Sequence, residues 1–233
     1  MIELVQNNGE YFIEIGEEEL KSLNGILLTS THKRELEILK DELDREVSLD
    51  SEKLDLNGAL KRSFTYQVLS NRADFESENR ELLFDKNVFQ WDRIFRLSPQ
   101  TDQLLRELEV IDKLKPVFES EWVHLPGVNK PAEEVKPEDI HWLPENLLEE
   151  LSSRTLKLPK MAFFAADFLW TFFHKYSYSV CLFFVEGRIT SEQFLDIFYV
   201  FNSTTEKSKM EEHDLKHYLE LLYRLEYLKK ALL

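Results

Sequence analysis

One segment of the sequence, residues 161–201, is far more apolar than the rest of the chain. It holds more than half of the seventeen phenylalanines. Burial of one aromatic side chain contributes roughly 2 to 3 kcal/mol, so this segment predicts the centre of a core. Charged residues such as Asp167, Lys175 and Glu186 interrupt it. It therefore never reaches the roughly eighteen uninterrupted apolar residues that indicate a membrane span.

Local signals divide the apolar segment into helices. Pro159 suits a first helical turn, residues 177–179 suit a break, and Gly187 suits a C-terminal cap. Thr190 and Gln193 have the spacing of a capping box, in which two side chains bond reciprocally to backbone N–H groups at a helix start. The segment therefore predicts a buried helical hairpin followed by a third helix.

The first ninety-five residues change from strand to helix periodicity. Tyr11, Ile13 and Ile15 alternate as in a half-buried strand, and Asn24-Gly25 is typical of a hairpin turn. An amphipathic helix is then predicted over residues 31–47, with Leu36, Leu39, Leu43 and Val47 on one stripe. A second helix is predicted from Leu60 to Phe75, and a returning strand at Glu81–Phe84. Residues 1–95 thus predict an α+β domain in which helices cover a small sheet.

Residues 96–233 predict an all-helical domain. Leu104, Leu108 and Ile111 define one helix, and Pro116 can open another through Phe118 and Trp122. A proline-rich connection over residues 124–143 precedes a helix at Glu145–Leu151. The final predicted helix, residues 210–233, has an inward stripe formed by Leu215, Leu219, Leu222 and Leu225.

Composition and missing motifs exclude several functions. The formal net charge is −15 and no basic run can track a phosphate backbone, so nucleic acid is excluded as a partner. The single cysteine allows no intramolecular disulfide and indicates a reducing compartment. The sequence has neither a glycine-rich phosphate loop nor the Gly-x-Ser-x-Gly motif of serine hydrolases. We therefore expect no enzyme activity and no cofactor.

Two alternatives stay open beside a non-enzymatic role. His213 and His217 lie four residues apart, as in helical zinc motifs, so a small helical enzyme could place them with a carboxylate between the domains. The acidic charge would also suit an adaptor for a basic partner.

We predict that the protein holds no metal, because two histidines without a third ligand make a poor zinc site. Elemental analysis of protein purified without chelator is expected to find none. Stoichiometric zinc that disappears in His213→Ala would contradict this prediction and favour the enzyme.

In Leu20–Gly25, Glu42–Asp44, Ser179–Phe201 and His213-Asp214, the sequence resembles the assembly chaperones for the alpha subunit of the F-type ATP synthase, the ATP-twelve type. Leu20–Gly25 and Glu42–Asp44 are similar to its Leu-Lys-Thr-Pro-x-Gly and Glu-Trp-Asp patterns, at the same spacing. Ser179–Phe201, which includes the turn Glu186–Glu192, is similar to its apolar helix, Gly-Arg-Leu-Thr turn and next helix. His213-Asp214 matches a His-Asp near the start of its last helix.

The sequence departs from the family at several positions, and one departure lies in a segment that is implicated in the family's function. Leu43 replaces a tryptophan, and Ile197–Asn202 replaces Leu-Glu-Glu-x-Tyr-Gln with no Trp-Gly after it. A divergent member could keep the fold and alter the partner contact. The resemblance implies that the contact residues are Leu43, Phe198, Tyr199, Asn202, His213 and Asp214.

The resemblance also implies a function and a cellular location. It implies a chaperone without cofactor, and we expect it to be monomeric. It would bind the unassembled alpha subunit and shield the subunit's apolar interface until the beta subunit joins. The N-terminal residues have no signal or transit pattern. We expect the bacterial cytoplasm, or the mitochondrial matrix if a presequence is missing.

Overall fold

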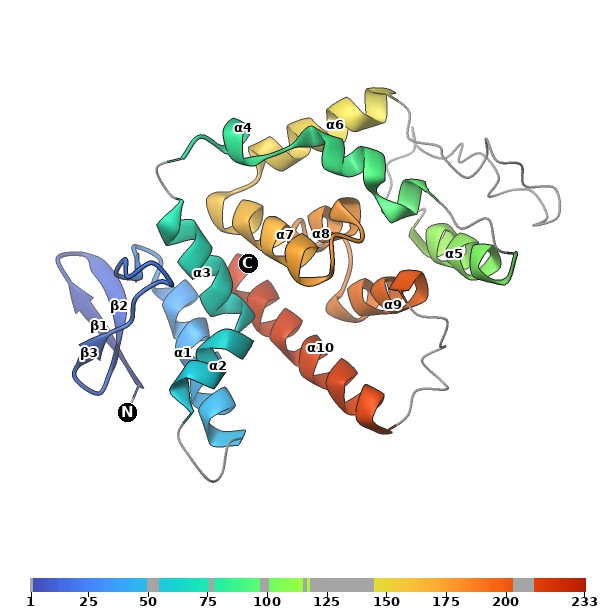
Figure 1. The fold of residues 1–233 in the computed structure, drawn as a ribbon. Coiled ribbons are helices and arrows are strands. Elements are labelled where there is room, and N and C mark those ends of the chain that lie inside the picture. Colours follow the sequence, from blue (N-terminus) through green and yellow to red (C-terminus); the bar gives the residue numbers. More distant parts are fainter. Residues whose placement is uncertain are drawn as a thin grey trace. The chain divides into compact units, whose positions relative to one another are not determined.

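The chain divides into two compact units that alternate along the sequence. Figure 1 shows its helices and strands, coloured from the N-terminus to the C-terminus. The computed structural model describes residues 2–49, 55–75, 78–96, 101–114, 117, 145–202 and 212–233. The first unit comprises Met1–Glu78, Pro159–Phe168 and Leu219–Leu233, and the second comprises Asn79–Leu158 and Leu169–Tyr218. Helices α7 (Lys160–Phe172) and α10 (Glu212–Leu232) contribute residues to both. The domain boundary that the sequence predicts between residues 95 and 96 stays a prediction, which limited proteolysis can test.

A small antiparallel sheet begins the first unit, as predicted. Its strands are β1 (Ile2–Asn7), β2 (Glu10–Ile15), β3 (Glu18–Glu19) and β4 (Thr29–Ser30). Strand β2 is central, because β1 pairs along one side of it and β3 and β4 pair along the other. The predicted Asn-Gly turn is confirmed: the Ser22 N–H donates to the Ile26 carbonyl at 2.7 Å, and Gly25 has a φ of +83°.

Three helices of the first unit follow the sheet: α1 (Lys33–Leu49), α2 (Leu56–Arg62) and α3 (Phe64–Asp74). Helix α1 packs on β1, β2 and β4. It buries Leu36, Leu39 and Leu43, which confirms most of the predicted stripe, although Val47 is only half-buried. The single helix predicted from Leu60 to Phe75 is wrong, because Ser63 adopts an extended conformation between α2 and α3.

The second unit is helical. Its remaining elements are α4 (Arg80–Leu83), η1 (Lys86–Trp91), η2 (Arg93–Phe95), α5 (Thr101–Leu114), α6 (Glu145–Lys157), α8 (Tyr178–Val185) and α9 (Ser191–Asn202). The strand predicted at Glu81–Phe84 is wrong. Asn79 caps a short helix there by accepting from the Glu81 N–H at 3.0 Å. The predicted helix through Phe118 and Trp122 and the connection over 124–143 lie outside the described residues.

Helix α8 ends in a Schellman motif, which fits the predicted glycine cap. The Gly187 N–H donates to the Phe184 carbonyl and the Arg188 N–H donates to the Phe183 carbonyl, both at 2.9 Å. Gly187 has a φ of +73°, the left-handed conformation that glycine adopts without a Cβ clash. This cap ends the second arm of the predicted hairpin.

The predicted capping box then starts α9. The Gln193 N–H donates to Thr190 Oγ1 at 3.1 Å, and the Thr190 N–H donates to Gln193 Oε1 at 2.8 Å. The reciprocal pair satisfies two N–H groups that the helix itself cannot satisfy. Local sequence therefore sets both ends of the turn between α8 and α9.

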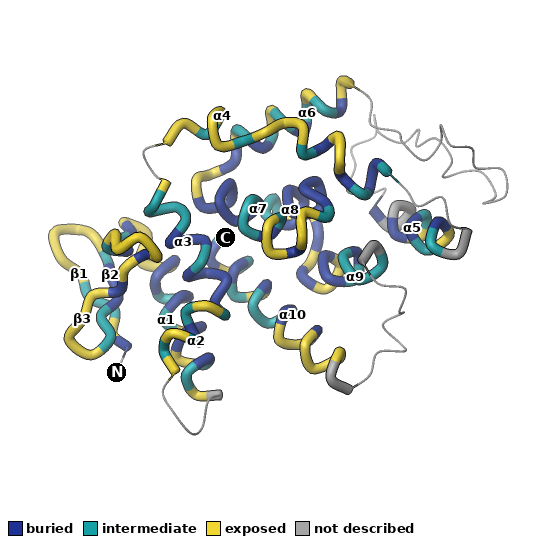
Figure 2. The backbone as a smooth tube through the Cα atoms, in the orientation of Figure 1, coloured by how far each residue is buried: buried dark blue, intermediate teal, exposed yellow. Residues whose placement is uncertain are grey.

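Helix α8 and its neighbours form the aromatic core of the second unit. Figure 2 shows α8 buried along nearly its whole length. Phe183, Phe184 and Phe194 are each at most 2 % exposed. The Phe184 and Phe194 rings contact at 5.1 Å between centroids, and Phe173 packs on Phe194 at the same distance. This confirms the apolar segment as the centre of a core.

The predicted inward stripe of α10 is wrong at its first half. Leu215 is 42 % exposed and Leu219 is 54 % exposed. The buried residues of this helix are instead Tyr218, Leu221, Leu225, Leu228 and Ala231. Leucines lie on several faces of α10, so leucine spacing alone did not identify the packed face. None of the helices in the described part of the chain is long and apolar enough to cross a membrane.

We predict that Phe184→Ala lowers the free energy of unfolding by about 3 to 5 kcal/mol, because the ring is fully buried and its removal leaves a cavity. Phe172→Ala is the matched control, since the Phe172 side chain is 40 % exposed and should lose much less. Urea unfolding of both variants measures the difference. Equal losses would contradict a core position for Phe184.

Candidate functional site

The residues predicted to bind a partner lie on three helices. Phe198 and Tyr199 are half-buried on α9, and Asp214 is exposed on α10. Leu43 lies on α1 and is fully buried, so the free protein presents none of its side chain to a partner. The side chains of Asn202 and His213 lie outside the described residues.

Phe198 and Tyr199 belong to a chain of aromatic contacts within the second unit. The Phe198 ring lies 4.6 Å from Phe173 and 5.7 Å from Tyr199, measured between centroids. Tyr199 in turn packs on Tyr218 at 5.5 Å. The Tyr218 hydroxyl donates to Asp196 Oδ1 at 2.9 Å, which connects α9 to α10. The contacts fix both half-exposed rings in place.

The structure brings Tyr199 and Asp214 into one electrostatic environment. Burial, followed by the negative charge of Asp214, raises the pKa of the Tyr199 hydroxyl. Leu215, exposed beside Asp214, adds apolar area that the sequence analysis had placed in the core. We call Phe198, Tyr199, Asp214 and Leu215 the α9–α10 surface.

The structure describes only one side chain of the histidine pair. His217 is exposed, and the side chain of His213 lies outside the described part of the chain. Within the described ranges, no three His, Cys, Asp or Glu side chains gather in a group that could hold a metal ion.

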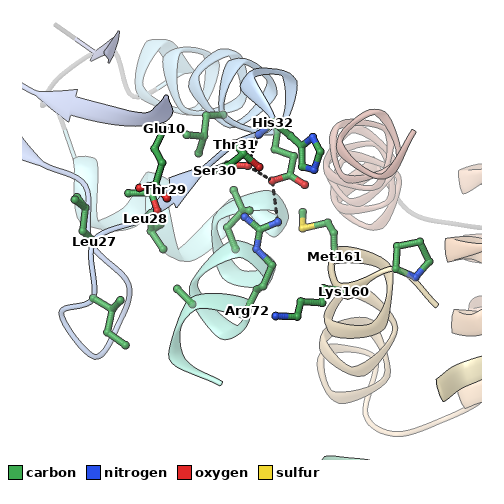
Figure 3. Close-up of a pocket in the computed structure, with 16 residues that line it drawn as sticks. Glu10, Leu27, Leu28, Thr29, Ser30, Thr31, His32, Arg72, Lys160 and Met161 are labelled. Atoms are coloured by element: carbon green, nitrogen blue, oxygen red, sulfur yellow. Dashed lines mark hydrogen bonds and ion pairs between the residues drawn. The ribbon is translucent and has the colours of Figure 1, made fainter. Parts of the chain in front are cut away.

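A pocket of about 430 Å³ opens in the first unit (Figure 3). Its walls come from residues 26–32, which include β4, and from helices α1, α3 and α7. Glu35 Oε2 accepts hydrogen bonds there from Ser30 Oγ at 2.7 Å and Arg72 Nη1 at 2.8 Å. Sequence reasoning missed this pocket, since its lining residues are scattered along the chain without a motif.

Two buried carboxylates have raised pKa values, which is often a sign of catalysis. Burial raises the pKa of Glu42 to about 7 and that of Asp92 to about 6. Neither residue lines the 430 Å³ pocket. Glu42 instead accepts from Ser63 Oγ at 2.8 Å and from the Phe64 N–H at 3.1 Å.

Asp92 has the same structural role in the second unit. Its Oδ2 accepts from the Ser179 N–H at 2.7 Å, and its Oδ1 accepts from the Ile94 N–H at 3.1 Å. Both carboxylates thus cap helix N-termini, where free N–H groups and the helix dipole favour negative charge. Their hydrogen bonds assign them to the fold rather than to chemistry.

No family model matches the chain, and no curated protein matches it. Among solved structures, it is similar to Atp12 from Paracoccus denitrificans, with a TM-score of 0.59 and 15 % identity over 99 % of this chain and 93 % of that one. It is also similar to the Atu1473 protein from Agrobacterium tumefaciens, with a TM-score of 0.65 and 14 % identity over 99 % of this chain and 82 % of that one. The fold implied by the resemblance to the ATP-twelve type is thereby confirmed.

We predict that Glu42 makes stability fall as pH rises. Its pKa is raised from 4.5 to about 7 in the folded protein, so the folded state binds this proton more tightly than the unfolded chain. The resulting stability is fully present below 4.5 and is lost as pH rises to about 7. The loss amounts to about 3 kcal/mol, at 1.4 kcal/mol per pKa unit.

Glu42→Gln should remove that slope in urea unfolding measured at several pH values. The variant should also be less stable at low pH, because an amide nitrogen would replace one acceptor oxygen of the cap. Glu37→Gln makes the same charge change on α1 at a side chain that is 45 % exposed. It is the control and should keep the wild-type slope. An unchanged slope in Glu42→Gln would show that another group titrates.

Proposed function

We propose that this protein is an assembly chaperone of the F-type ATP synthase, which binds the unassembled alpha subunit. The observation that carries the proposal is the likeness to Atp12, which extends over 99 % of this chain. The order of the matching sequence segments supports it, since they fall in both units. Obligate interfaces resemble a divided core and aggregate when exposed, so covering one requires binding and no chemistry.

The pattern of matches and departures fits a retained fold with an altered contact. Within Glu42–Asp44, Glu42 is the buried cap of α3. Within Glu186–Glu192, Gly187 and Thr190 form the turn between α8 and α9. These matched residues therefore have structural roles in the fold. The departures at Phe198 and Tyr199 are at half-exposed positions, where a change costs the fold less.

We infer that the α9–α10 surface contacts the alpha subunit, together with Asn202 and His213. Phe198, Tyr199 and Leu215 supply apolar area there, so binding should depend only weakly on salt. Leu43, being fully buried, would support the contact by packing rather than touch the partner. The protein would work as a monomer, in the bacterial cytoplasm or the mitochondrial matrix.

We predict that this protein suppresses aggregation of the purified cognate alpha subunit without consuming nucleotide. Light scattering at several-fold molar excess measures the suppression, with and without moderate salt. Leu215→Asp should weaken it, because the change places a charge in the apolar contact. Leu105→Asp is the matched control, since Leu105 is 47 % exposed and Leu215 is 42 % exposed.

Unchanged aggregation of the alpha subunit at this excess would refute the chaperone function. Suppression that disappears in moderate salt would retain the function and refute the apolar contact, and would point to the acidic surface. Equal loss in Leu215→Asp and Leu105→Asp would refute the location of the contact on the α9–α10 surface.

A further inference from the structure

The pocket in the first unit has no part in the proposed contact. Its lining residues all belong to the first unit, whereas the α9–α10 surface belongs to the second. At about 430 Å³ it falls in the size range of small-ligand sites. We propose that this pocket binds a carboxylate group, held by Arg72 and Lys160.

Arg72 is the centre of the proposed site. Its side chain is only 14 % exposed and its Nη1 is paired with Glu35 Oε2 at 2.8 Å. Its Nε and Nη2 have no acceptor among the described residues. A guanidinium presents its N–H groups in a planar fork that matches the two oxygens of a carboxylate. Arg72 therefore keeps donors for a ligand after its internal pairing.

Glu35 orients Arg72 and takes up only part of its capacity. Ser30 Oγ donates to the same Glu35 oxygen at 2.7 Å and Ser30 also accepts from the His32 N–H at 3.0 Å. The guanidinium is thus held by a buried network before any ligand arrives. Preorganised donors lose less entropy on binding than mobile surface side chains do.

The helix wall of the pocket adds further positive charge. Pro159, Lys160 and Met161, at the start of α7, line it together with Arg72 from α3. The start of a helix carries a partial positive charge, which reinforces the Lys160 ammonium. The other carboxylate in the lining, Glu10, comes from the sheet, and Figure 3 shows it beside Thr29. An anion that enters the pocket would therefore meet the cationic groups of Arg72 and Lys160 on its helical wall.

The carboxylate could belong to a free small acid or to an acidic side chain of a protein, and one titration separates the two. Chemical shifts of backbone amides in the ¹⁵N-labelled protein are followed with succinate, and with uncharged succinamide as its control. A capped Gly-Glu-Gly peptide and its Gly-Gln-Gly counterpart form the second pair. The variants are Arg72→Lys, which keeps the pairing to Glu35 without the fork, and Lys160→Glu.

We expect saturable shifts around Ser30, Thr31 and Met161 with the carboxylates and none with the amides. Each variant should weaken binding by at least about tenfold. Lys157→Glu makes the same charge change outside the pocket and should bind within about twofold of wild type. Tighter binding of succinate would identify a small acid as the source, and tighter binding of the peptide would identify a protein side chain; either result supports the site.

Three outcomes would overturn the proposal. The first is equal shifts with succinamide, and the second is carboxylate binding that survives both variants. The third is an absence of saturation with all four probes. None of these outcomes bears on the chaperone function, because that function is measured on the alpha subunit.

Discussion

Each unit depends on a buried carboxylate that caps a helix from a distant part of the chain. Glu42 on α1 accepts from Ser63 Oγ and from the Phe64 N–H, which fixes α1 to the start of α3. Asp92 accepts from the Ser179 N–H and so fixes the start of α8. A helix start buried without such a partner would leave N–H groups unsatisfied at a cost of about 1 to 3 kcal/mol each. The surrounding apolar core can close only because these groups are bonded.

The elements that sequence analysis predicted correctly are those set by neighbouring residues. The Asn24-Gly25 turn, the Gly187 cap and the Thr190 capping box each need only a few residues to form. Two of the errors arise where a distant partner decides. The break at Ser63 depends on Glu42, 21 positions earlier. The packed face of α10 depends on contacts such as that of Tyr218 with Asp196, which leucine spacing does not reveal.

The two candidate sites also differ in how far the sequence predicts them. Phe198 and Tyr199 could be proposed from sequence because they stand where a known family pattern is altered. The pocket at Arg72 could not, since its donors come from helices far apart in the chain and follow no motif. Burial explains the remaining discrepancy: Leu43 occupies a position of family interest, yet it lies in the core. Spacing identifies candidate residues, whereas exposure decides which of them a partner can reach.

The proposed function requires this protein to hold the alpha subunit in a form that the beta subunit can take over. Size-exclusion chromatography with light scattering on the purified proteins tests it most directly. We expect one copy of this protein to bind one alpha subunit. Added beta subunit should then replace this protein, which yields the free protein and an alpha–beta complex. A mixture in which this protein and the alpha subunit elute separately at micromolar concentration would contradict the proposed function.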